Sequence, residues 1–122
     1  MTELKTALLQ VQKAMKEQEC YKNYQLCLKK IKKDEKLYRE LNTFRKKNVE
    51  LHANQYTLRE EAHLAQEFKN LLFNESVKEF LHWEQKTLEL IKMLHNVINN
   101  GLDMDYDFFV NPEPEENTNE DQ

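Results

Sequence analysis

Apolar residues recur along the first third of the chain at the spacing of an α-helix. In the first stretch they lie four, three and four positions apart, which places them on one face of a helix. These positions are Leu4, Leu8, Val11 and Met15. The pattern predicts an amphipathic helix of about four turns that starts at Thr2.

Two further helices follow, and both have an apolar stripe among many lysines. The stripe of the second helix consists of Tyr21, Tyr24, Leu28 and Ile31. The stripe of the third consists of Leu37, Leu41, Phe44 and, less regularly, Leu51. Asp34 stands between them and can accept a hydrogen bond from the free backbone N–H groups of a helix start. We therefore expect the second helix to end, and the third to begin, at Asp34.

The remaining helix starts are indicated by capping residues. Thr57 followed by Glu60 fits a capping box, which predicts a fourth helix from Thr57 to Leu72. Asn74 is expected to open a fifth helix of roughly 25 residues that ends at Gly101. Its wide apolar stripe consists of Val77, Phe80, Leu81, Leu88, Ile91, Leu94 and Ile98.

Composition supports an all-helical chain. The 122 residues include one glycine and two prolines, and all three lie after position 100. This excludes glycine-rich phosphate loops and glycine hairpin turns from the first hundred residues. The fold class expected is therefore all-α, a bundle of about five helices with short connections and a long C-terminal helix. We expect a single helical domain over residues 1–109 and an acidic, disordered tail over residues 110–122.

The length of the fifth helix suggests an oligomer. About 25 residues at 1.5 Å each give roughly 38 Å, more than the diameter of a compact domain of this size. Part of its stripe is therefore expected to meet a second chain. The sequence contains neither a signal-peptide core nor a stretch of roughly 20 apolar residues, so we expect a cytoplasmic protein without a membrane segment.

Charge is unevenly distributed along the chain. Residues 1–50 carry 13 basic and 7 acidic side chains, whereas residues 101–122 carry 8 acidic and no basic ones. A basic cluster consists of Lys29, Lys30, Lys32, Lys33 and Lys36. It allows an alternative function, an RNA-binding helical module that uses this lysine face. A solvated basic face is more common, and the acidic tail would compete for the same lysines.

No catalytic motif is evident. The four histidines lack metal-binding spacing, and Glu60 and Glu61 are explained by helix capping, so we expect no enzyme activity and no metal site. Cys20 and Cys27 are seven residues apart, about 10 Å along a helix, which is too far for a disulfide. Glu84 interrupts the apolar stripe of the fifth helix and needs a partner, either solvent or a charged group that fixes helix register or a subunit contact.

Several of these residues resemble the YlbF/YmcA family, the control-of-competence regulators of Gram-positive bacteria. The N-terminal part of the pattern consists of Tyr21, Tyr24, Lys32, Lys33, Asp34, Phe44, Glu60 and Glu61. A more specific string consists of Leu71, Asn74, Val77, Phe80, Leu81, Glu84, Leu88, Ile91 and Ile98. Asp103, Asp105, Phe108 and Phe109 are similar to the ending of many members. The resemblance spans roughly residues 4–109.

The resemblance implies a non-enzymatic, oligomeric regulatory or scaffold protein. Similar family members act in a complex that modulates the endoribonuclease RNase Y, and thereby competence, sporulation and biofilm formation. The partners implied are a second copy, related family members and RNase Y. The family complex is associated with iron–sulfur clusters held by cysteines, but this chain has none after Cys27, so we expect no cofactor.

The surface expected to contact partners is the stripe of the fifth helix together with the acidic, aromatic segment that follows. Its residues are Val77, Phe80, Leu81, Trp83, Glu84, Leu88, Ile91, Phe108 and Phe109. The aromatic residues of the last segment could equally cover the chain's own helices.

Overall fold

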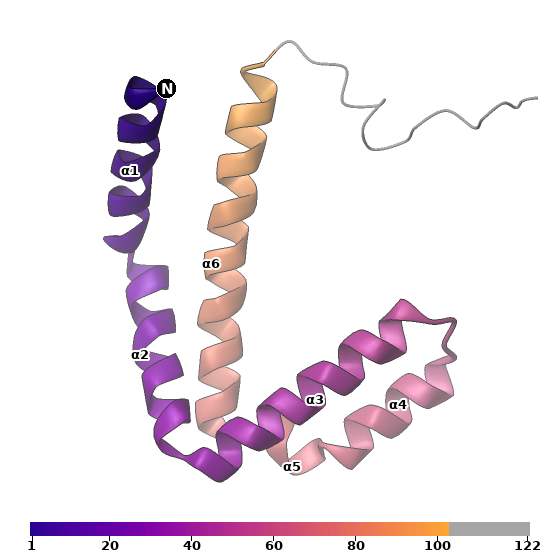
Figure 1. Cartoon of the computed structure of the whole chain (residues 1–122). Coiled ribbons are helices and arrows are strands. Elements are labelled where there is room, and N and C mark those ends of the chain that lie inside the picture. Colours follow the sequence, from indigo (N-terminus) through magenta and orange to yellow (C-terminus); the bar gives the residue numbers. More distant parts are fainter. Residues whose placement is uncertain (103–122) are drawn as a thin grey trace, which may run out of the picture. The chain divides into compact units, whose positions relative to one another are not determined.

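The structure is a computed structural model that describes residues 1–102. Six α-helices succeed one another in this part of the chain (Figure 1). They are α1 (Thr2–Lys16), α2 (Glu19–Lys33), α3 (Glu35–Ala53), α4 (Leu58–Glu67), α5 (Lys69–Leu72) and α6 (Glu75–Asn100). The described residues include no strand, which confirms the predicted all-α class and the long last helix. The proposed domain limit at residue 109, Phe108, Phe109 and the segment 110–122 lie outside the described residues.

Side-chain caps set the helix starts where the sequence placed them. The Leu37 backbone N–H donates to Asp34 Oδ1 at 3.2 Å, and the Val77 N–H donates to Asn74 Oδ1 at 3.1 Å. At the start of α4 the full capping box forms between Thr57 and Glu60. Each cap satisfies a backbone donor that the first helical turn leaves free. Polar side chains therefore make the turns that glycine and proline make in most proteins.

The predicted fourth helix is divided in two. The backbone of Phe68 leaves the helical region, with φ −106° and ψ 25°, so that α4 ends before it and the short α5 begins after it. The break turns the Phe68 side chain into the core, where it is 9% exposed. A continuous helix from Thr57 to Leu72, as the sequence pattern predicted, is therefore wrong at this residue.

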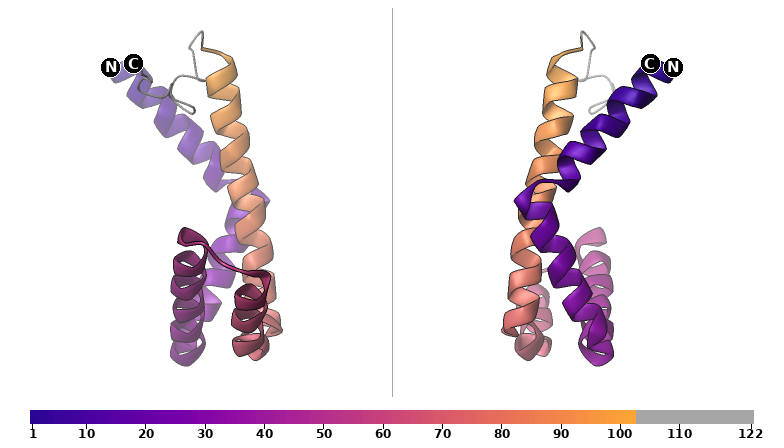
Figure 2. Two further views of the ribbon diagram at one scale, coloured as in Figure 1. Left: turned by 90° about the vertical axis from the view of Figure 1, so that its right-hand side faces the viewer. Right: turned by 90° about the vertical axis from the view of Figure 1, so that its left-hand side faces the viewer.

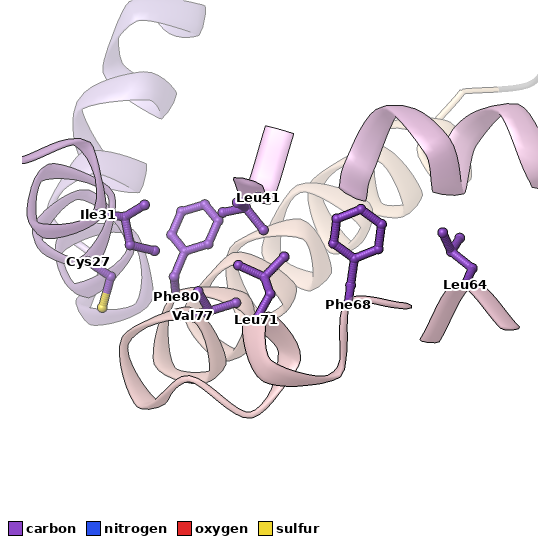
Figure 3. Close-up of a cluster of buried hydrophobic side chains, with 8 residues drawn as sticks. All are labelled: Cys27, Ile31, Leu41, Leu64, Phe68, Leu71, Val77 and Phe80. Carbon is purple, nitrogen blue, oxygen red and sulfur yellow. The ribbon is translucent and has the colours of Figure 1, made fainter. Parts of the chain in front are cut away.

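Contacts group the chain into two units, Met1–Glu89 and a second unit that begins at Leu90, and α6 is continuous across the boundary. In the first unit α3 and α4 lie side by side (Figure 2). The hydrophobic core of this unit draws on α2, α3, α4, α5 and the first part of α6 (Figure 3). It consists of Cys27, Ile31, Leu41, Leu64, Phe68, Leu71, Val77 and Phe80.

Helix α1 contributes nothing to this core. None of its residues is buried, and of the apolar face predicted for it Leu4, Leu8 and Val11 are exposed and Met15 is half-buried. Leu4, Leu8, Leu9 and Val11 are between 41% and 54% exposed. An amphipathic helix without a covered apolar face is an exception in a folded protein, because most helical stability comes from packing of that face.

Burial of Cys27 leads to a chemical prediction. Burial raises the pKa of the Cys27 thiol, and the nearby Glu79 carboxylate raises it further, so less of the reactive thiolate forms near pH 8. Cys20, on the same helix, is only half-buried. We expect iodoacetamide to alkylate Cys20 on the order of tenfold faster than Cys27 in the folded chain. Peptide mass spectrometry of a time course measures the two rates, and equal rates before urea is added would place Cys27 outside the core.

Candidate protein-interaction surface

The sequence placed nine residues in a partner surface, and the structure separates them by burial. Val77 and Phe80 are 0% and 2% exposed and belong to the core of this chain's own first unit. They hold helices together and are not part of an exposed surface. Leu81 and Trp83 are half-buried and pack against the same core.

Near the end of the first unit, the residues of α6 that are buried no longer coincide with the predicted apolar stripe. Thr87 is buried, and its hydroxyl donates to the Trp83 carbonyl oxygen at 2.8 Å. Leu88, which the periodicity assigned to the stripe, is 52% exposed. A buried threonine needs such a partner for its hydroxyl. Leu88 is therefore available to another molecule, and Thr87 takes its place in the interior.

Beyond Leu88, the second unit has its own apolar side chains. Ile91 is half-buried, and Met93, Val97 and Ile98 are between 49% and 63% exposed. Together with Leu90 and Leu94 they place six apolar residues within nine positions of one helix. Three of the six, Met93, Val97 and Ile98, are exposed, and exposed apolar side chains gathered on one helix are typical of an interaction site.

Glu84 has a partner that the sequence did not identify. Its Oε1 lies 2.5 Å from Nη2 of Arg45 on α3, and the two side chains are 23% and 38% exposed. The Arg45 guanidinium also lies over the Phe80 ring, 5.1 Å from its centroid. The pair joins α3 to α6 next to the core. A charged pair within the chain is one of the two partners considered for Glu84, and its role in helix register stays a prediction.

The contribution of this pair can be measured in a double-mutant cycle. For Arg45→Met and Glu84→Gln we expect a coupling free energy of unfolding of about 1 kcal/mol. This lies between the coupling free energies typical of exposed ion pairs and those of buried ion pairs. The exposed Lys86 and Glu89 pair on α6, 3.8 Å apart, offers a control with expected coupling below about 0.5 kcal/mol. Urea unfolding followed by circular dichroism gives all the free energies. Equal coupling in the two cycles would show that Arg45 and Glu84 do not set helix register.

All five lysines of the cluster are exposed, and three of them line hollows in two different places. Lys29 and Lys32 line a groove along α2, whereas Lys30 lines a hollow next to the acidic side chains Glu75 and Glu79. Lys33 ends α2 and Lys36 lies in the first turn of α3.

The cysteines do not fit an iron–sulfur cluster. Cys27 is buried and Cys20 lies seven residues away on the same helix, so a cluster could not bind both sulfurs without unwinding α2. No group of three or more histidine, cysteine or acidic side chains within residues 1–102 is arranged to hold a metal ion. Within the same residues, no helix has the length and apolar character needed to cross a membrane.

The fold and the exposed apolar side chains thus define a helical protein whose candidate site is a surface for contacts with other molecules. A family model described as "Control of competence regulator ComK, YlbF/YmcA" matches residues 5–103. The chain therefore belongs to the YlbF/YmcA family, a family of regulatory proteins. Searches of curated proteins and of solved structures gave no significant match.

Proposed function

We propose that this protein is a non-enzymatic regulator that acts as a scaffold through protein–protein contacts. The observation that carries the proposal is α1, an amphipathic helix whose apolar face is exposed from Leu4 to Val11. Exposing this face to water is unfavourable, and contact with a second molecule would remove the cost. The family's regulatory role supports the same conclusion.

The expected partner is a second copy of the chain or a related family member. The stripe of α6, with Leu88 and Val97 exposed and Ile91 half-buried, offers such a partner a second apolar surface. Leu81, Trp83 and Glu84, which pack against the first unit's own core or pair with Arg45, belong to the proposed surface on the basis of the sequence pattern. Phe108 and Phe109 belong to the proposed surface on the basis of their sequence alone. The assembly would be a dimer or a higher oligomer in the cytoplasm.

The regulatory target is proposed from the family resemblance to be RNase Y-dependent processing of messenger RNA. Competence, sporulation or biofilm formation would then respond through altered transcripts. The test is deletion of the gene in its native host, followed by mapping of transcript 5′ ends. We expect RNase Y-dependent ends to be lost and to return when the gene is restored. Unchanged RNA ends would contradict the RNase Y link, and unchanged ComK activity as well would contradict the regulatory proposal.

A further inference from the structure

The apolar face of α1 has the residue spacing of a coiled-coil contact. Leu4, Leu8, Val11 and Met15 are four, three and four residues apart, which is the spacing of the a and d positions in a heptad repeat. The first three side chains are 54%, 49% and 41% exposed, and Met15 is half-buried. Helix α1 therefore presents about two heptads of a and d positions, most of them open to solvent.

Two alanines on the same face allow a second helix to approach closely. Ala7 lies three residues after Leu4 and four before Val11, and Ala14 lies three after Val11, so both share the face of these residues. Both alanines are exposed. Because the distance between packed helices, about 8–10 Å, depends on the side chains at the contact, small residues here favour another helix as the occupant of this face.

Opposite charges line the two edges of the face. At 3.6 residues per turn, Glu3 and Glu17 fall on the edge beside the alanines, and Lys5 and Lys16 fall on the opposite edge. The backbone of Glu17, the C-cap of α1, is still in the helical region. All four charged side chains are exposed, and none of them forms an ion pair with another of residues 1–102. The face is thus acidic on one edge and basic on the other.

These edges are complementary to a second α1 in one orientation only. In a parallel pair the acidic edge of each helix faces the basic edge of the other, so Glu3 lies opposite Lys5 of the second copy and Glu17 opposite its Lys16. In an antiparallel pair each edge faces the same edge of the second copy. Glu3 would then meet Glu17, and Lys5 would meet Lys16, and like charges in contact are unfavourable.

We propose that α1 pairs in parallel with α1 of a second copy, as a short two-stranded coiled coil. The inference rests on the proposed function of α1 as a contact surface, and it adds which element meets this surface and in which direction. Coiled coils are usually sustained over roughly three to four heptads or more, so we expect the pairing of two heptads to be reversible and to depend on protein concentration.

A disulfide at Leu4 tests the direction of the pair. In the parallel pair Leu4 lies opposite Leu4 of the second copy, within the Cα separation of about 7 Å that a disulfide requires. In an antiparallel pair Leu4 lies opposite Met15, and roughly 16 Å of helix separates the two Leu4 positions. The substitution Leu4→Cys is made together with Cys20→Ser, and Lys13→Cys in the same background is the control on the opposite face of α1.

Oxidation with diamide, followed by a non-reducing gel, measures the yield of covalent dimers. We expect Leu4→Cys to give on the order of tenfold more dimer than Lys13→Cys. A mixture of Leu4→Cys chains and Met15→Cys chains covers the alternative orientation. Disulfides that form only between the two kinds of chain, or equal yields from Leu4→Cys and its control, would overturn the proposal.

Reversing the charge of one edge gives an independent measurement. The variant Glu3→Lys, Glu17→Lys makes both edges basic, so the facing charges of a parallel pair become alike. We expect the dissociation constant from light scattering at low salt to rise on the order of tenfold. The matched control Glu40→Lys, Glu50→Lys makes the same change of charge at exposed positions on α3 and should leave it unchanged. An antiparallel pair would not be weakened, because its facing charges are alike before and after the change.

A second charge reversal restores the complementary edges. Adding Lys5→Glu and Lys16→Glu to the basic variant should return the dissociation constant to that of the unaltered chain, which would exclude a loss of helix as the cause of the weakening. No restoration would contradict the parallel pair.

The outcomes separate this inference from the proposed function. If the charge reversal has no effect but Leu4→Glu, Leu8→Glu dissociates the oligomer, the parallel pair is wrong and α1 remains a contact surface. If the chain is a monomer but loses a captured protein in the Leu4→Glu, Leu8→Glu variant, α1 binds a different protein. That result would also overturn the inference, and it would leave the scaffold role in place.

Discussion

Replacement of Phe80 by alanine is expected to lower the free energy of unfolding by about 3–5 kcal/mol. Phe80 is 2% exposed and its ring stacks on that of Tyr24, with centroids 5.4 Å apart. The same ring lies under the Arg45 guanidinium. Truncation removes the link between α2, α3 and α6 and leaves a cavity. Because small domains are stable by only about 5–15 kcal/mol, much of the helical signal should be lost well below the unfolding temperature of the parent.

Phe73→Ala is the matched control for this prediction. Phe73 follows α5 and is 66% exposed, so the same chemical change should cost less than about 1 kcal/mol. Urea unfolding of both variants, followed by circular dichroism at 222 nm, supplies the comparison. If the two losses were equal, the core would not be built around Phe80 as described.

Placing charge on the apolar face of α1 is expected to abolish self-association. In Leu4→Glu, Leu8→Glu both substituted positions are about half exposed, at 54% and 49%. Leucine and glutamate have similar helix propensities and α1 buries nothing, so the helix content of the monomer should not change. Two carboxylates in an apolar contact would have to be desolvated without partners, so the dissociation constant of the oligomer should rise at least on the order of a hundredfold.

Val49→Glu, Leu58→Glu offers a control with the same chemistry elsewhere. These residues lie on α3 and α4 and are 67% and 82% exposed. Their replacement should leave association unchanged. Light scattering after size-exclusion chromatography, over a range of protein concentrations, measures the mass of each variant. A parent that is a monomer at all accessible concentrations, or a control that dissociates as fully as the α1 variant, would contradict an α1 interface.

Local sequence patterns were sufficient to predict the helices and most of their boundaries. Asp34, Thr57 and Asn74 cap helix starts because their side chains satisfy backbone donors three residues away, a relation that can be read directly from the sequence. The break at Phe68 could not be predicted in this way. It contains neither glycine nor proline, and it brings Phe68 against Phe44 of α3, with ring centroids 5.3 Å apart.

The candidate surface was predicted less well than the fold. Periodicity identifies an apolar face but does not show whether the chain's own helices or another molecule cover it. Val77 and Phe80 were therefore assigned to the same surface as Leu88, although the structure buries the first two and exposes the third. The position of Glu84 in an apolar stripe showed that its carboxylate needs a partner. That partner, Arg45, lies 39 residues away in the sequence, so only the packing of α3 on α6 identifies Arg45 as the partner.

The central claim is that this protein regulates through contacts made by the α1 face. Affinity purification from the native host, followed by quantitative mass spectrometry, tests it most directly. The unaltered chain, the Leu4→Glu, Leu8→Glu variant and the Val49→Glu, Leu58→Glu control would be compared at equal expression. We predict that the unaltered chain and the control recover the same partners, among them a YlbF/YmcA relative or RNase Y, and that the α1 variant loses them. Partner recovery that is the same for all three proteins would contradict the claim.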